Sequence, residues 1–236
     1  MEEAQLHPEI PRVPSRRISR FRQLIEMLVL LALIVPSSVL ASSTYQQEHI
    51  TFQLVAWATL ARDLALVLLI LFFAWRNRES LSLIGWRFRG MEFVWGLLLF
   101  LPFLFLTIGV EAMFHLMGLG GPPRTIPSFL IPRTASDIAL AVVLVIIVAI
   151  AEETIFRGYL LLRLRNLGAS IAVALIISST IFALGHGYEG ASGMATVGVM
   201  GFLFGLIYLW RGSLIAPIVM HFLQDFIGLI ITPHLS

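Results

Sequence analysis

Seven stretches of mostly apolar residues alternate with short polar segments along this chain. An α-helix needs about 20 apolar residues to cross the hydrocarbon core of a bilayer, and most of the stretches approach or exceed that length. The predicted spans cover residues 24–40, 52–75, 93–118, 137–165, 170–186, 191–210 and 214–232. This pattern predicts an all-α polytopic transmembrane bundle of about seven spans. An eighth, short or re-entrant helix is the alternative if the Pro-rich connection 119–136 contains one.

Arginine residues gather on one side of the predicted bundle. If the N-terminal tail is cytoplasmic, the opposite side holds only Arg124 and Arg133. The cytoplasmic segments then hold Arg12, Arg16, Arg17, Arg20, Arg22, Arg76, Arg78, Arg87, Arg89, Arg157, Arg163, Arg165 and Arg211. Cytoplasmic loops of membrane proteins carry an excess of basic residues. We therefore expect a multi-pass protein of a bacterial cytoplasmic membrane, with its N-terminus in the cytoplasm and its C-terminus outside.

The domain organisation predicted from this pattern is simple. Residues 1–23 form a basic cytoplasmic tail that we expect to be disordered, and residues 24–236 form a single membrane-embedded helical domain. The first span also resembles a secretory signal, with small residues around Val39-Leu40-Ala41 as a cleavage site. We interpret it as a retained span, because the apolar run is long enough and the tail before it is unusually long for a signal.

Composition supports a membrane protein and excludes several kinds of site. The chain is 58% hydrophobic and 13% charged, with a mean hydropathy of +0.91, whereas soluble domains average about 25% charged residues. It contains no Cys, which excludes disulfides, thiolate metal ligands and a cysteine nucleophile. The net charge of +2 comes from arginines in loops. That charge suits anionic lipid headgroups, and the chain gives no sign of nucleic-acid binding.

Two adjacent glutamates, Glu152 and Glu153, follow an unbroken apolar run at residues 140–150. An ionised carboxylate facing hydrocarbon costs several kcal/mol, so both side chains must face something polar. On a continuous helix Glu153 and Arg157 lie at i and i+4 on one face, whereas Glu152 points about 100° away. Glu152 is then a candidate general base or acid. The alternative is a wet, interfacial end of the helix, where all three side chains are solvated.

Further ionisable residues occur on the last predicted spans. His186 follows Phe182 by four residues, and Asp225 follows His221 by four. Three spans thus carry groups that cannot face lipid, and a shared cavity is the least costly arrangement for them. This cavity offers two routes to hydrolysis: water activated by a carboxylate with histidine support, or water on a metal held by His and carboxylate. The His-Glu-x-x-His zinc helix is absent, so a metal site would be assembled between helices.

Two other features receive a structural interpretation. The pair Arg62-Asp63 lies within the second span, and we interpret it as a lock between helices rather than a functional site. Gly201 and Gly205 in the sixth span are spaced so that a neighbouring helix can approach closely. Neither feature is assigned chemistry from the sequence.

The polar motifs resemble those of the CPBP family of intramembrane proteases. This family includes the CAAX prenyl endopeptidases and bacteriocin-processing or immunity proteins, and is also called the Abi family. Its motif Glu-Glu-x-x-x-Arg matches Glu152, Glu153 and Arg157, its Phe-x-x-x-His matches Phe182 and His186, and its His-x-x-x-Asn/Asp matches His221 and Asp225. The match covers about the C-terminal third to two-fifths of the chain. The motif-bearing core is predicted at residues 137–232.

The resemblance implies a role for each matching residue. Glu152 and His186 would activate the water that attacks a peptide carbonyl, and His221 with position 225 would stabilise the oxyanion. Glu153 and Arg157 would hold the helix geometry. Eukaryotic prenyl endopeptidases usually have Asn where Asp225 stands, which weakens the inference of a prenylated CAAX substrate. Because an ionised carboxylate repels an oxyanion, Asp225 must be protonated, orient His221, or bind a metal.

We therefore predict an intramembrane endopeptidase that acts near the membrane on a protein or peptide, either lipidated or hydrophobic. Its cavity is expected near the middle of the membrane, open to the cytoplasm. Zn²⁺ held by His186, His221 and Glu152 is one expectation for the mechanism, and a metal-free reaction is the other. Two rival functions remain: a non-catalytic immunity or scaffold protein of the same family, and an ion- or proton-coupled transporter.

Overall fold

A computed structural model describes residues 18–44, 50–119 and 128–234 of the 236-residue chain. These residues form helices and short connections, with no strand among them, and the all-α prediction is confirmed. Residues 1–17 and most of the Pro-rich connection lie outside the described residues. At the proposed cleavage site around Val39-Leu40-Ala41, the description covers a helical backbone and not the side chains. Within the described part of that connection, only the short helix η2 (Ser128–Leu130) is present.

Seven helical stretches match the seven predicted spans, with shifted ends. The first three are α1 (Arg20–Thr44), α2 (Phe52–Asn77) and α3 (Gly90–Leu116). The fourth is continuous from α4 (Ala135–Glu152) through the π-helical segment η3 (Glu153–Leu160) to α5 (Leu161–Leu167). The last three are α6 (Ile171–Leu184), α7 (Gly190–Arg211) and α8 (Ile215–Asp225). The short segments are η1 (Leu81–Ile84), η4 (Gly187–Glu189), the π-helical η5 (Phe226–Ile231) and η6 (Thr232–His234).

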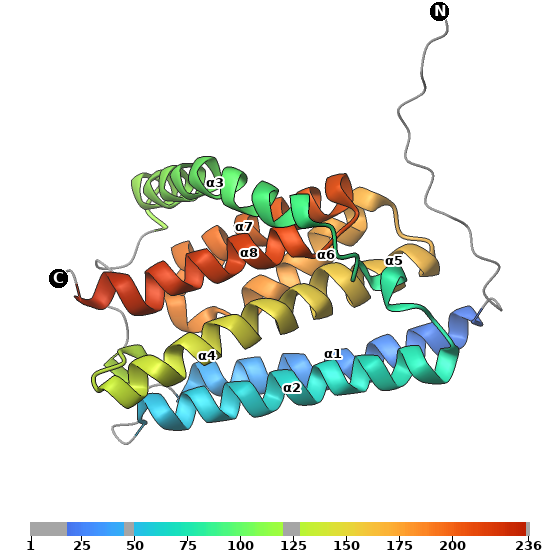
Figure 1. Cartoon of the computed structure of the whole chain (residues 1–236), viewed down its shortest axis with the longest axis horizontal. Helices are drawn as coiled ribbons and strands as arrows, with labels where there is room; N and C mark the ends of the chain where they lie inside the picture. The colour runs from blue at the N-terminus through green and yellow to red at the C-terminus, as the bar shows by residue number, and fades with distance from the viewer. Residues whose placement is uncertain (1–17, 45–49, 120–127, 235–236) are drawn as a thin grey trace, which may run out of the picture.

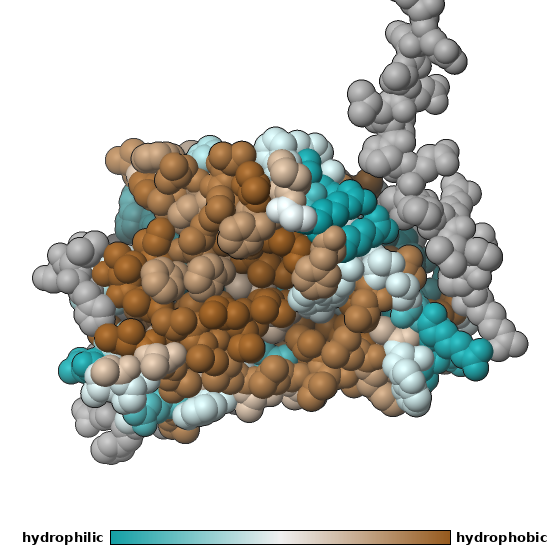
Figure 2. Space-filling model, viewed as in Figure 1, coloured by the Kyte–Doolittle hydropathy of each residue, from teal (hydrophilic) through white to brown (hydrophobic). Residues whose placement is uncertain are grey.

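Four helices in the described residues are long and apolar enough to cross a membrane: Phe52–Asn77, Gly90–Leu116, Ala135–Leu167 and Gly187–Arg211. The apolar helices Ile171–Leu184 and Ile215–Ile231 are shorter than the others. Figure 2 shows a broad apolar band over the middle of the visible face, with hydrophilic residues toward its two ends. This distribution is typical of a helical membrane protein.

The helices run roughly along one direction and alternate in sense (Figure 1). α4 packs against α2 and α8, α3 packs against α8 and α7, and α6 packs against α7. The bundle therefore has two ends. We call the end where α2, α5 and α7 finish the arginine-rich end, and the end where α3, α6 and η5 finish the arginine-poor end.

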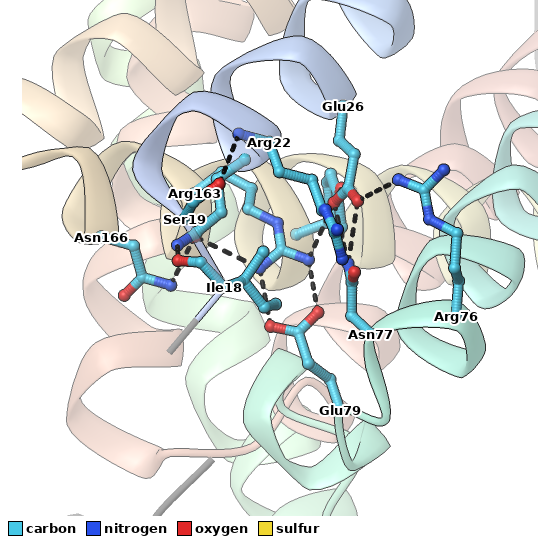
Figure 3. Close-up of polar contacts among 11 residues, drawn as sticks. Ile18, Ser19, Arg22, Glu26, Arg76, Asn77, Glu79, Arg163 and Asn166 are labelled. Carbon is cyan, nitrogen blue, oxygen red and sulfur yellow. Dashed lines mark hydrogen bonds and ion pairs between the residues drawn. The ribbon is translucent and has the colours of Figure 1, made fainter. Parts of the chain in front are cut away.

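A polar cluster ties helices together at the arginine-rich end (Figure 3). We call it the Glu26–Arg163 cluster; it joins α1, α2, η3 and α5 and consists of Glu26, Arg76, Asn77, Glu79, Tyr159 and Arg163. The Glu26 carboxylate accepts hydrogen bonds from Arg76 Nη2 at 2.6 Å, from Asn77 Nδ2 at 2.9 Å and from Tyr159 Oη at 3.1 Å.

Arg163 is central to this cluster. Its two terminal nitrogens donate to the two oxygens of Glu79, and its side chain is fully buried. The sequence placed Arg163 in a cytoplasmic segment, and the structure corrects its environment: the side chain lies inside the end of the bundle. The bidentate hydrogen bonds to the Glu79 carboxylate offset the cost of removing the guanidinium from water.

Candidate active site

A cavity of about 610 Å³ lies among the helices and contains most of the polar residues singled out in the sequence. Its polar lining includes residues from every motif and from α2, among them Arg62, Asp63, Glu152, His186, His221, Gln224 and Asp225. Glu111 and Glu189 also line it. Apolar side chains such as Val55, Leu104 and Leu144 form much of the remaining wall. Three motif-bearing spans therefore line one cavity with Glu152, His186, His221 and Asp225, whereas Glu153 and Arg157, which were expected in it too, are not among its lining residues.

The two adjacent glutamates occupy different positions, as the helical geometry predicts. Glu152 is the last residue of α4 and lines the cavity, whereas Glu153 begins η3 and is completely buried. Glu153 Oε1 accepts a hydrogen bond from Arg157 Nη1 at 2.8 Å, which forms the expected i,i+4 pair. Both partners of that pair are buried, so the alternative of a solvated interfacial helix end is wrong for this segment.

His221 on α8 connects the two glutamates. Its Nδ1 donates to Glu153 Oε1 at 2.8 Å, because a carboxylate can only accept a hydrogen bond. Its Nε2 lies 3.7 Å from Glu152 Oε2 and 3.4 Å from Asp225 Oδ2. The buried Glu153 thus fixes the imidazole ring of His221. Nε2 of that ring faces two carboxylates that line the cavity.

Arg157 acts from behind the cavity. Its guanidinium lies 4.3 Å from the centre of the Phe182 ring and 5.4 Å from that of Phe204. A methyl group on Gly201 would come within 2.9 Å of both Arg157 Nη2 and Phe182 Cδ1. The glycine assigned to packing therefore makes room for the motif arginine and for the motif phenylalanine.

His186 follows the end of α6 and lines the same cavity. Its Nδ1 lies 3.0 Å from the carbonyl oxygen of Phe182, so Nδ1 carries a proton and donates to that carbonyl. Its ring lies 4.9 Å from the Phe182 ring, which in turn meets the His221 ring edge to face at 5.9 Å. Phe182 thus separates the two motif histidines and contacts both.

Arg62 and Asp63 on α2 belong to the cavity, which the sequence interpretation as a helix lock did not predict. Arg62 Nε donates to Asp63 Oδ1 at 2.8 Å, and Arg62 Nη2 lies 3.7 Å from Glu152 Oε1. The signal in the sequence was their depth in an apolar span, which makes ionisable residues candidates for function. The N-terminal half of the chain therefore supplies a cation, Arg62, next to Glu152.

Two π-helical segments adjoin the motifs. η3 begins at Glu153, and η5 begins directly after Asp225. π-Helical turns are rare and occur frequently at functional sites. Nothing in the local sequence distinguishes these segments from α-helix, so packing between helices decides their geometry.

The described carboxylates and histidines of the site do not form a metal cage. Within the described ranges, no group of three or more His, Cys, Asp or Glu side chains is placed so that it could hold a metal. Because Nδ1 of His221 is bonded to Glu153 and Nδ1 of His186 to a carbonyl, Nε2 is the nitrogen that each ring could offer to a metal. The side-chain arrangement does not fit the expected His186, His221 and Glu152 ligand set, and zinc binding stays a prediction.

The direction of the cavity differs from the expected one. From Glu152 it extends past Asp225 and Gly228 to Thr232, and past His186 to Tyr188 and Glu189. All of these further residues lie toward the arginine-poor end, where α6 and η5 finish. The lining residues therefore run toward the arginine-poor end and, among the described residues, not toward the arginine-rich segments on whose side the opening was expected.

Comparison with known proteins gives two matches. Residues 134–227 match the family model described as type II CAAX prenyl endopeptidase Rce1-like. The chain is also 30% identical over 160 residues to the uncharacterized protein YpbD of Bacillus subtilis (strain 168), a match that covers 66% of this chain and 76% of that protein. No solved structure matches significantly. The matched family region contains all six candidate site residues of the motifs and excludes Arg62 and Asp63.

Proposed function

Because the chain belongs to the Rce1-like family of type II CAAX prenyl endopeptidases, we propose that it is an intramembrane endopeptidase that uses Glu152 to activate water. The observation that carries this proposal is the position of Glu152. It lines a cavity large enough for a peptide segment, and it lies beside a histidine whose ring is fixed by a second, buried glutamate. A carboxylate supported in this way is suited to general-base catalysis.

The reaction follows from these contacts. Glu152 takes a proton from a water molecule, and the water oxygen attacks the peptide carbonyl carbon to give a tetrahedral intermediate. The same carboxylic acid then returns the proton to the amine nitrogen as the C–N bond breaks. His186, whose Nδ1 donates to a carbonyl, has Nε2 as its acceptor nitrogen and supports the water from the other side.

The oxyanion needs donors, and His221 supplies one when both of its ring nitrogens carry a proton. In that form Nδ1 donates to Glu153, and Nε2–H faces the cavity carboxylates Glu152 and Asp225 and is available to the oxyanion. A donor held by packing before the reaction stabilises the developing negative charge without reorganisation. Glu153 and Arg157 act on His221 and on the helix rather than on the substrate, so they are positioning residues.

The substitution Glu152→Gln tests the function. We expect a loss of about 10²–10⁴-fold in peptide cleavage, the usual contribution of a general base, with normal thermal unfolding in detergent. Activity is measured with a quenched-fluorescence peptide selected in a screen against the wild type. Glu111→Gln removes another carboxylate from the same cavity, and we expect it to cost less than about tenfold.

Retained cleavage by Glu152→Gln would contradict the proposed mechanism. If the wild type cleaves no peptide and the biological effect survives Glu152→Gln, the chain is a non-catalytic member of the family whose cavity binds a partner. The comparison of the two glutamine variants separates loss of the base from a general loss of negative charge.

A further inference from the structure

The cavity is connected to only one end of the described bundle. From the motif residues it continues along η5 to Gly228 and Thr232, and beside η4 to Tyr188 and Glu189. It also reaches Leu130 in η2. All of these residues lie at or near the arginine-poor end, where α3, α6 and η5 finish (Figure 1).

The opposite direction is blocked by packed side chains. Ile34, Leu66 and Ile155 line the cavity on that side. Beyond them lie the fully buried side chains of Leu30, Ile70 and Tyr159, which belong to one hydrophobic cluster. The Glu26–Arg163 cluster follows at the end of the bundle, where Tyr159 donates to Glu26. No lining residue of the cavity, among those described, comes from the connections at this blocked end.

Charge assigns the two ends to the two sides of the membrane. Arg133 is the one described arginine near the arginine-poor helix ends, whereas the other end carries Arg20, Arg22, Arg76, Arg78, Arg87, Arg89, Arg163, Arg165 and Arg211. An excess of Arg in the segments that flank spans marks the cytoplasmic side. The blocked end of the cavity is therefore the cytoplasmic one.

We propose that the substrate reaches Glu152 from the non-cytoplasmic side of the membrane. The substrate class is then a peptide segment that has already crossed the membrane and stays close to its outer surface, such as the membrane-proximal part of an anchored or exported chain. This inference rests on the proposed peptidase function for its chemistry and on the cavity for its direction. It excludes a prenylated C-terminus presented from the cytoplasm.

The walls and the charges of the cavity fit such a segment. Val55, Leu104 and Ile108 line the route with apolar surface, which suits hydrophobic side chains next to a membrane anchor. Asp225 lies beyond Glu152 on the way out, and its side chain is 31% exposed. A peptide arriving from this side meets these apolar walls together with Glu111 and Glu189 before it reaches Asp225 and Glu152.

Cysteine accessibility tests the direction, because the chain has no native Cys. Gly228 is an exposed cavity residue in η5, and Gly90 is an exposed residue at the start of α3, at the blocked end. A side-chain carbon built on either glycine meets no atom within 4 Å. The single variants Gly228→Cys and Gly90→Cys are therefore a matched pair that packing tolerates.

Each variant is treated with a membrane-impermeant maleimide in right-side-out and in inverted membrane vesicles. We expect Gly228→Cys to be labelled in right-side-out vesicles and Gly90→Cys in inverted vesicles. Thr232→Cys, farther out along the same route, is expected to behave as Gly228→Cys does and guards against a folding defect in one variant.

Two results would overturn the proposal. Labelling of Gly228→Cys in inverted vesicles alone would place the mouth of the cavity in the cytoplasm. Labelling after detergent treatment but from neither side would show that no aqueous route exists. Both results are independent of catalysis, so they are distinguishable from a failure of Glu152→Gln to abolish cleavage.

Discussion

Two buried polar clusters lie in the same bundle, and they differ in what surrounds them. In the Glu26–Arg163 cluster, Glu26 accepts from four side chains, one of them Arg163, and Arg163 also meets both oxygens of Glu79. In the candidate site, Glu152, His221 and Asp225 line a cavity. Both clusters combine carboxylates with arginine at depth. Ionisable residues inside a membrane bundle therefore indicate a function only where they also border space for a ligand.

The hydrogen bonds of the carboxylate oxygens also differ between the two clusters. Around the candidate site, the atoms Asp63 Oδ2, Glu152 Oε2 and Glu153 Oε2 are buried without a hydrogen-bond partner among the described residues. In the other cluster both oxygens of Glu26 and both oxygens of Glu79 are bonded, although Asn77 Oδ1 and Arg163 Nε are also buried without a partner among the described residues. Buried polar atoms are usually satisfied by protein or water, so the incomplete carboxylates lie where water or a substrate completes the network.

The largest effect on stability is expected from Arg163→Met. This change leaves Glu79 and Glu26 without their buried cation, and breaking a buried ion pair costs about 3–5 kcal/mol. Thermal unfolding in detergent would measure the loss, and activity should fall only with the folded fraction. Arg165→Met is the matched control, because Arg165 is exposed and its one side-chain hydrogen bond among the described residues goes to the Ala169 carbonyl. Equal unfolding temperatures for both variants would contradict a structural role for the cluster.

The helices and the site motifs could be predicted because both depend on local sequence. Apolar runs of membrane length fix the spans, and i,i+4 spacing places Glu153 beside Arg157 and His221 near Asp225. The need to shield charge from lipid then brings the motif helices together. These inferences require no knowledge of which helix neighbours which.

Features that depend on helix neighbours could not be predicted. Glu26 is 137 residues from Arg163 along the chain, and Arg62 comes from a helix outside the matched family region. The sequence showed that these residues are charged, but their partners depend on the packing of α1 against α5 and of α2 against α4. The direction of the cavity was missed for the same reason, since it depends on which end the hydrophobic cluster fills.

Arg62→Met is expected to have an intermediate effect that sharpens the comparison. The change removes the cation beside Glu152 and Asp63. We expect cleavage to fall about tenfold, which corresponds to about 1.4 kcal/mol. Because the Arg62 side chain is 33% exposed but its partner Asp63 is buried, we expect a fall in the unfolding temperature that is smaller than for Arg163→Met. Arg62→Lys keeps the charge and should restore most of the rate. If both variants lose stability and their activity falls only with the folded fraction, Arg62 is a lock between helices instead.

Asp225→Asn is expected to have the smallest effect, although the residue belongs to a motif. The side chain lies 3.4 Å from His221 Nε2 and is partly exposed, so an amide of the same shape keeps a polar neighbour for the ring. It also removes a negative charge that repels the oxyanion. We expect kcat/KM to stay within about threefold of wild type or to rise. A loss above about 100-fold would mean that the carboxylate itself is needed, as a base or as a metal ligand, and that Glu152 does not act as the sole acid–base group.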